Sequence, residues 1–125
     1  MHAQANPFAQ GKLVRVIQGR VVDVAVDIRK NSPTYGQHFA IELSGENHKQ
    51  LWVPPGFLHG FLTLEDDTIF TYKVSNYYDK ASEIGIMWND PTLNIDWATY
   101  LDPKEFSLSD KDLVLGDFAS FQSPF

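Results

Sequence analysis

The stretch KLVRVIQGRVVDVAVDI, residues 12–28, decides the fold of this chain. In its second half, one alternating set of positions is wholly apolar: Val22, Val24, Val26 and Ile28. The positions between them mix apolar side chains with aspartates. A period of two is typical of a β-strand with a buried face, and Gln18-Gly19 interrupts the run. The stretch therefore predicts two consecutive strands joined at Gln18-Gly19.

The same pattern continues in shorter pieces along the chain. Strands are predicted within residues 37–44, 51–53, 60–64, 69–78 and 83–90. Turn-rich segments separate them, and the corner at Pro54-Pro55-Gly56 is incompatible with a continuous central strand. Many short strands with intervening turns favour an all-β jelly roll, with an immunoglobulin-like sandwich as the alternative. We expect one domain over residues 1–125, no strand at the start of the chain, and a single short helical turn in the C-terminal tail.

Composition excludes several classes of protein. The net charge of −6 argues against binding to a nucleic-acid backbone. No run of 18 apolar residues is present, so no transmembrane helix is expected. The absence of cysteine is compatible with a reducing compartment, and we expect a cytoplasmic protein. A local basic pocket for a small anionic ligand stays compatible with this acidic balance.

The four histidines are His2, His38, His48 and His59. No two are separated by a single residue, the spacing that would point both side chains of a strand at one ion. A metal site is therefore not expected. A metal-dependent oxygenase or isomerase is disfavoured for the same reason.

Several residues carry possible chemistry and also have a purely structural interpretation. His59, next to Gly60 in an apolar context, is either a proton-transfer group or a core histidine. Tyr72 in the middle of a strand is either an acid or a packing residue. Asp23 and Lys12 fall in adjacent strands, where a surface ion pair is the default. Asp112 ends the motif Ser109-Asp-Lys-Asp, which resembles a helix capping box.

Three stretches, at residues 9–37, 46–64 and 70–97, resemble one enzyme family. The motifs DVAVD, QLW-P-GF-HGF and YK--NYY are similar to those of the dTDP-4-dehydrorhamnose 3,5-epimerases, which are cupin-type jelly-roll enzymes acting on sugar nucleotides. The resemblance extends from about His2 to Asp112. It implies a homodimer, no cofactor, and a dTDP-linked 4-keto-6-deoxy sugar as the small-molecule partner.

The resemblance also implies roles for individual residues. His2 falls on the family's catalytic base, Asp112 on the carboxylate that pairs with it, and Tyr72 on the acid that returns a proton from the opposite face. The substrate-binding positions are Lys12, Asp23, His59, Tyr78 and Lys111. Ala3 stands where the family usually has an aromatic residue, and the spacer before Asp112 is longer than usual, so the capping interpretation of Asp112 stays open.

The family normally carries a further segment before the histidine, so we expect a chain that is N-terminally truncated relative to the family. The leading hypothesis is epimerisation at C3 and C5 of dTDP-4-dehydro-6-deoxy-D-glucose. One alternative is a catalytically impaired or non-catalytic sugar-nucleotide-binding fragment, since a base at a frayed chain end lacks fixed geometry. Another is an epimerase that inverts only C3 or only C5 of a related dTDP-deoxysugar.

Overall fold

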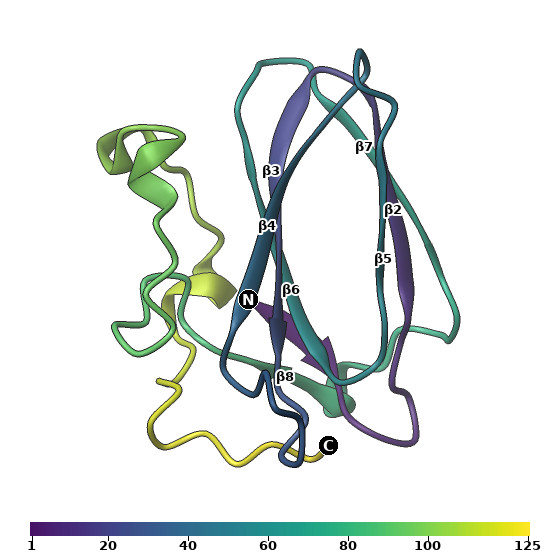
Figure 1. Cartoon of the computed structure of the whole chain (residues 1–125), viewed down its shortest axis with the longest axis vertical. Helices are drawn as coiled ribbons and strands as arrows, with labels where there is room; N and C mark the ends of the chain where they lie inside the picture. The colour runs from purple at the N-terminus through teal and green to yellow at the C-terminus, as the bar shows by residue number, and fades with distance from the viewer.

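Two antiparallel sheets face each other in the computed structural model, which describes all of residues 1–125 (Figure 1). The larger sheet has the strand order β4-β3-β6-β1-β8, and the smaller has the order β5-β2-β7. The strands are β1 (His2–Gln4), β2 (Lys12–Gln18), β3 (Arg20–Asp27), β4 (His38–Ser44), β5 (Gln50–Val53), β6 (Phe57–Thr63), β7 (Ile69–Val74) and β8 (Glu83–Gly85). The all-β sandwich predicted from the sequence is confirmed.

The break at Gln18-Gly19 moves the chain from one sheet to the other. Gly19 adopts a φ of +76°, which only glycine adopts readily. A Cβ at this position would also lie 2.8 Å from the Cα of Thr68. The corner therefore requires glycine, and it places β2 and β3 in different sheets.

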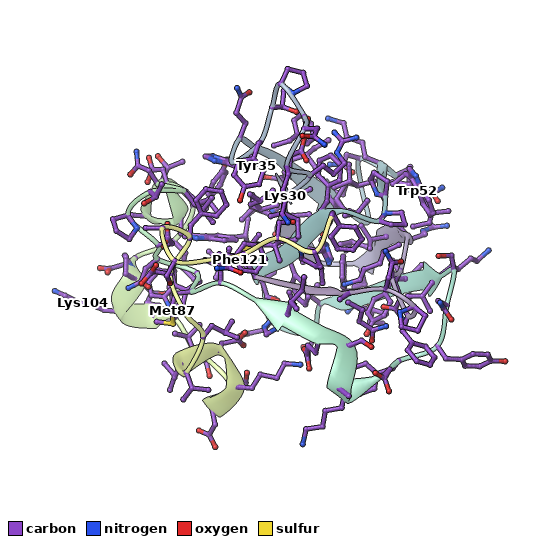
Figure 2. The ribbon with its side chains drawn as sticks, turned by 90° about the horizontal axis from the view of Figure 1, so that it is seen from below. Lys30, Tyr35, Trp52, Met87, Lys104 and Phe121 are labelled. Carbon is purple, nitrogen blue, oxygen red and sulfur yellow. The ribbon has the colours of Figure 1, made fainter.

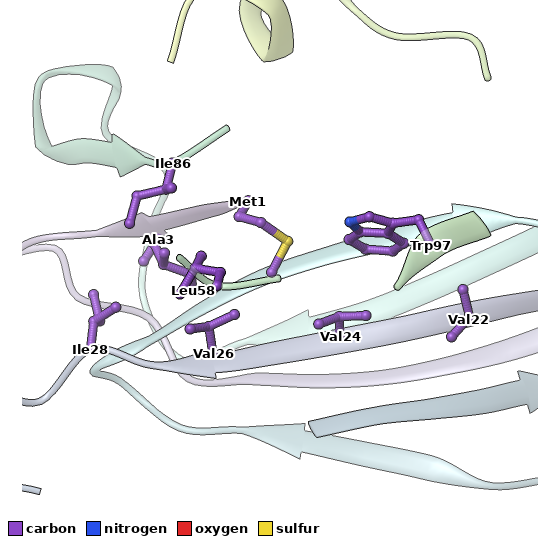
Figure 3. Packing of buried hydrophobic residues seen from close by; sticks show 10 residues of the cluster. Met1, Ala3, Val22, Val24, Val26, Ile28, Leu58, Ile86 and Trp97 are labelled. Carbon is purple, nitrogen blue, oxygen red and sulfur yellow. The ribbon is translucent and has the colours of Figure 1, made fainter. Parts of the chain in front are cut away.

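Strand β3 is buried on both of its faces from Val21 to Asp27. The wholly apolar face points outward and packs beneath the C-terminal segment, where Trp97 covers it (Figure 3) and Leu93 belongs to the same buried cluster. That segment lies on the side of the large sheet away from the small one (Figure 1). In a view from below, it runs across the strands near Phe121, which packs against the same cluster (Figure 2).

The mixed face of β3 points inward, between the two sheets. A small cluster of Val14, Val16, Val21 and Leu43 fills one end of this space. The other end holds polar and aromatic side chains instead of a packed core. This division leaves room for a cavity between the sheets.

Three details differ from the sequence predictions. Residues His2–Gln4 were expected to form no strand, yet they form β1, which pairs with both β6 and β8. Strand β6 begins directly after Gly56 rather than at Gly60. The chain carries four short 3₁₀ helices: η1 (Lys80–Ser82), η2 (Trp97–Thr99), η3 (Pro103–Glu105) and η4 (Asp110–Leu113). A three-residue strand has no readable periodicity, and its pairing with distant strands supplies the missing signal.

None of these helices is long and apolar enough to cross a membrane.

Candidate active site

An open cavity of about 1420 Å³ is lined by residues of both sheets and of the C-terminal tail. Strands β1, β6 and β8 form one wall, β2 and β7 form the opposite wall, and residues from the C-terminal tail close one side. Seven of the eight residues singled out from the sequence line it: His2, Lys12, His59, Tyr72, Tyr78, Lys111 and Asp112. The eighth, Asp23, lies buried directly behind His59.

His2 is held by strand pairing on both sides. Its Cα pairs with His59 of β6 and with Gly85 of β8, so its imidazole points into the space between the sheets. The Nε2 atom lies 2.5 Å from Oδ1 of Asp112. The Nδ1 atom is buried without an aligned hydrogen bond, although Oε1 of Glu83 lies 3.2 Å away. Two carboxylates therefore flank one imidazole.

Asp112 fits both of its interpretations, because it takes part in a helix cap and also contacts His2. It lies in η4, where Ser109 is the N-cap and accepts the backbone N–H of Asp112. The Ser109 hydroxyl also donates to Oδ2 of Asp112 at 2.6 Å, which leaves Oδ1 for His2. The helix cap thus orients the carboxylate toward the imidazole.

The charges of this pair are set by burial and by mutual contact. Burial lowers the pKa of His2 below its ordinary value, and the contact with Asp112 offsets only part of that effect. Burial alone would raise the pKa of Asp112, but hydrogen bonds from His2 and Ser109 outweigh it and lower that pKa. The arrangement at neutral pH is therefore a neutral imidazole that donates from Nε2 to Asp112 and keeps the lone pair of a general base on Nδ1, the nitrogen next to Glu83.

His59 and Asp23 form a second imidazole–carboxylate pair, deeper in the molecule. Nε2 of His59 lies 2.9 Å from each carboxylate oxygen of Asp23, and the side chains are 7% and 0% exposed. The expected surface ion pair between Asp23 and Lys12 is wrong. The two residues belong to different sheets, and Asp23 points into the sandwich because its strand is covered on both faces.

Lys12 and Tyr72 lie on the wall opposite His2. Both come from the small sheet, where Lys12 begins β2 and Tyr72 lies on the edge strand β7. Burial lowers the pKa of Lys12, and the nearby charges of Asp23 and Glu83 oppose that effect. Tyr72 is 59% exposed, and its ring is 6.1 Å from that of Phe70. Tyr72 is therefore more exposed than a tyrosine that only packs within the sheet would be.

Glu83 is a member of the site that the sequence did not reveal. Its carboxylate contacts the ammonium group of Lys111, and its Oε2 accepts the hydroxyl of Tyr78 at 3.0 Å. The contact with Glu83 raises the pKa of Lys111 and that of Tyr78. A glutamate at the start of a short strand carries no motif, and its importance becomes visible only when its partners are brought together.

No group of three or more His, Cys, Asp or Glu side chains is arranged to hold a metal ion. His38 and His48 lie outside the cavity. What the cavity contains is a half-buried histidine paired with a carboxylate, a tyrosine from the opposite wall, and two further hydrogen-bond donors, Lys12 and His59.

Comparison with known proteins identifies the family. Residues 1–120 match the family described as dTDP-4-dehydrorhamnose 3,5-epimerase. This chain belongs to that family. It is 51% identical over 113 residues to the dTDP-4-dehydrorhamnose 3,5-epimerase of Shigella flexneri, covering 90% of this chain and 60% of that protein. It is 47% identical over 119 residues to the Escherichia coli enzyme of the same name, covering 92% and 64%.

Solved structures of this epimerase family agree with the fold. The structure from Elizabethkingia anophelis matches with a TM-score of 0.91 at 45% identity, covering 94% of this chain and 63% of that one. The structure from Legionella pneumophila, a complex with dTDP-4-keto-L-rhamnose, matches with a TM-score of 0.88 at 45% identity, covering 97% and 62%. The cupin-type jelly roll is thereby confirmed over the immunoglobulin-like alternative. The chain spans about three fifths of the length of these epimerases.

Proposed function

We propose that this chain epimerises C3 and C5 of dTDP-4-dehydro-6-deoxy-D-glucose to give dTDP-4-dehydro-L-rhamnose. Membership of the epimerase family supports the reaction class, and the Legionella pneumophila relative binds dTDP-4-keto-L-rhamnose. The observation that carries the proposal is the placement of His2, backed by Asp112, and Tyr72 on opposite walls of one cavity. Inversion of a carbon centre requires a base on one face and an acid on the other.

His2 acts as the base in this mechanism through Nδ1, because Nε2 is bound to Asp112, and its ring turns away from Glu83 to reach the substrate. It removes the proton on C5, which is acidic because it lies next to the C4 ketone, and the electron pair moves onto the C4 oxygen as an enolate. Asp112 holds the imidazole in place and stabilises its protonated form. Lys12 and His59 stabilise the enolate oxygen by hydrogen bonding and charge.

Tyr72 completes the inversion. Its hydroxyl donates a proton to C5 from the face opposite His2, the C4 ketone re-forms, and the configuration is inverted. His2 then loses its proton, Tyr72 regains one from solvent, and the same steps follow at C3. No electrons leave the substrate, so the atoms balance without a redox partner.

The alternative is a chain that binds the sugar nucleotide without catalysis, and it assumes that His2 lies at a frayed chain end. His2 instead lies in a strand that is paired on both sides, and its side chain is anchored by Asp112. Fixed geometry of this kind supports catalysis over mere binding.

A deuterium-exchange measurement tests the proposal. The purified chain is incubated with dTDP-4-dehydro-6-deoxy-D-glucose in D₂O, and C3 and C5 are followed by NMR. Exchange at both carbons that is abolished by His2→Asn supports the proposal. Exchange at one carbon identifies a single-site epimerase, and no exchange despite binding of dTDP identifies a binding-only chain. Either of these two results contradicts it.

We further propose that the chain is a single-domain cytoplasmic protein that forms a homodimer. The outer edge of β7 has no neighbouring strand, and the exposed apolar side chain of Ile69 begins that strand, which supports self-association. A monomeric mass in light scattering during gel filtration would contradict the dimer.

A further inference from the structure

Gln4 is a buried polar residue that the mechanism above does not use. It lies on β1, two residues after His2, and is 5% exposed. Its Nε2 donates to the carbonyl oxygens of Phe8 at 2.6 Å and Tyr77 at 3.0 Å, and its Oε1 accepts the backbone N–H of Asp79 at 2.9 Å. Turning the amide over would place NH₂ against an N–H and oxygen against two carbonyls, so these partners fix its orientation.

Two of these bonds lie on either side of one residue. Tyr77 and Asp79 are the neighbours of Tyr78 in the chain, so Gln4 holds the backbone immediately before and immediately after Tyr78. This segment joins β7 to η1 and has no strand pairing of its own. Such a connection is mobile unless side chains anchor it.

The side chain of Tyr78 is anchored to the same frame. Its hydroxyl donates to Glu83, and Glu83 is the residue paired with Gln4 between β1 and β8. Gln4 therefore fixes the backbone of Tyr78 while Glu83 fixes its hydroxyl. Both belong to the two adjacent strands that also position His2.

We propose that Gln4 is a positioning residue that fixes Tyr78 at the cavity relative to His2, and so determines the affinity for the sugar nucleotide. The inference rests on the proposed function, because it takes Tyr78 as a substrate contact. Tyr78 is exposed and lines the cavity, so its ring is accessible to a bound ligand. Since Gln4 does not contact His2, its loss weakens binding and leaves the proton transfers largely intact.

The test combines Gln4→Met with Tyr78→Ala. Gln4→Met keeps the length of the side chain and removes all three hydrogen bonds. We expect it to raise the KM of the 4-keto sugar nucleotide and the Kd of dTDP by roughly tenfold, with kcat changed by less than about threefold. Because both residues act on one contact, Tyr78→Ala should weaken binding much less in the Gln4→Met background than in the wild type.

Two controls separate positioning from stability. Gln18→Met removes another strand glutamine, whose Nε2 donates to the carbonyl of Asp67; neither residue lines the cavity, so KM should be unchanged. Gln4→Asn keeps the amide group on a side chain one methylene shorter, so it should fall between Gln4→Met and the wild type. It also provides a second variant if Gln4→Met does not fold.

The inference is overturned if the Gln4 variants leave KM and Kd unchanged, if they lower kcat at constant KM, or if the effects of Gln4 and Tyr78 are additive. Failure of the proposed function looks different. In that case the wild type itself shows no exchange at C3 or C5, whatever residue occupies position 4.

Discussion

His59 lies with its Nε2 atom 2.9 Å from both carboxylate oxygens of Asp23, and this pair is buried more deeply than the pair formed by His2 and Asp112. The two imidazole–carboxylate pairs lie on one inner surface, because His2 and His59 are register partners between β1 and β6. The deeper pair is closed to solvent on the Asp23 side, whereas the shallower pair opens onto the cavity. This difference in burial predicts different consequences when each carboxylate is removed.

Removing the buried carboxylate should mainly reduce stability. Asp23→Ala leaves Nε2 of His59 buried without a partner, and we expect the free energy of unfolding to fall by about 3 kcal/mol. Asp23→Asn keeps an oxygen that can accept from His59 and should cost less than half of that. Urea denaturation at pH 7 measures both. An equal loss for the two variants would mean that the hydrogen bond to His59 is not what stabilises the fold.

Removing the shallower carboxylate should mainly change the pH dependence of catalysis. Asp112 raises the pKa of His2, so Asp112→Asn lowers it further. The base must be neutral, and activity rises as pH increases through that pKa. We therefore expect the acidic limb of kcat/KM to move to lower pH, with the plateau reduced roughly 100-fold.

Ser109→Ala is the matched control for Asp112→Asn, because it removes the cap hydroxyl and keeps the carboxylate next to His2. It should cost about 1 kcal/mol of stability and move the acidic limb much less. An acidic limb at the same pH in the wild type and in Asp112→Asn would remove Asp112 from the mechanism.

The sequence pattern predicts strand β3 but not strand β1. Strand β3 was predictable because eight residues carry a full alternating pattern, and their local pattern agrees with the sheet that forms. Strand β1 has three residues, and its partner β8 lies some eighty residues along the chain. Its existence depends on tertiary pairing, which no local pattern encodes.

The residues of the site also divide into those that the sequence predicts and those that it does not. The family motifs predicted the residues that meet in the cavity, including Tyr72 and Lys12. The resemblance also gave Asp23 a place at the pocket, whereas the strand pattern alone predicted a surface ion pair, because an aspartate on a strand is normally placed toward solvent and the covering of the second face is a property of the whole fold. Glu83 was missed because its partners, His2, Tyr78 and Lys111, come from three separate segments.

Lys12 should determine the alkaline side of the pH profile. Burial lowers its pKa from the ordinary value of 10.5, and stabilisation of an enolate requires the ammonium form. Activity should therefore fall as pH rises through this lowered pKa. Lys12→Arg keeps the charge at all accessible pH values, so its residual activity should persist to higher pH. Lys12→Met should lower kcat roughly 100-fold, and an unchanged alkaline limb in Lys12→Arg would exclude Lys12 as its origin.

Asp27 should account for part of the acid sensitivity of the fold. This buried carboxylate accepts hydrogen bonds from Arg29, Ser32 and Thr34, and the contact with Arg29 contributes most to holding its pKa well below the usual range. A depressed pKa in the folded state stabilises the protein above the unfolded-state value of about 4, and this stabilisation is lost as pH falls below it. Asp27→Asn removes the charge, and we expect a loss of about 2 kcal/mol at pH 7 that shrinks between pH 5 and pH 3. Urea denaturation at both ends of that range measures the difference, with the exposed Glu46→Gln as control. A loss that is equally large at pH 3 would mean that the shape of the loop, and not the charge of Asp27, stabilises this end of the sandwich.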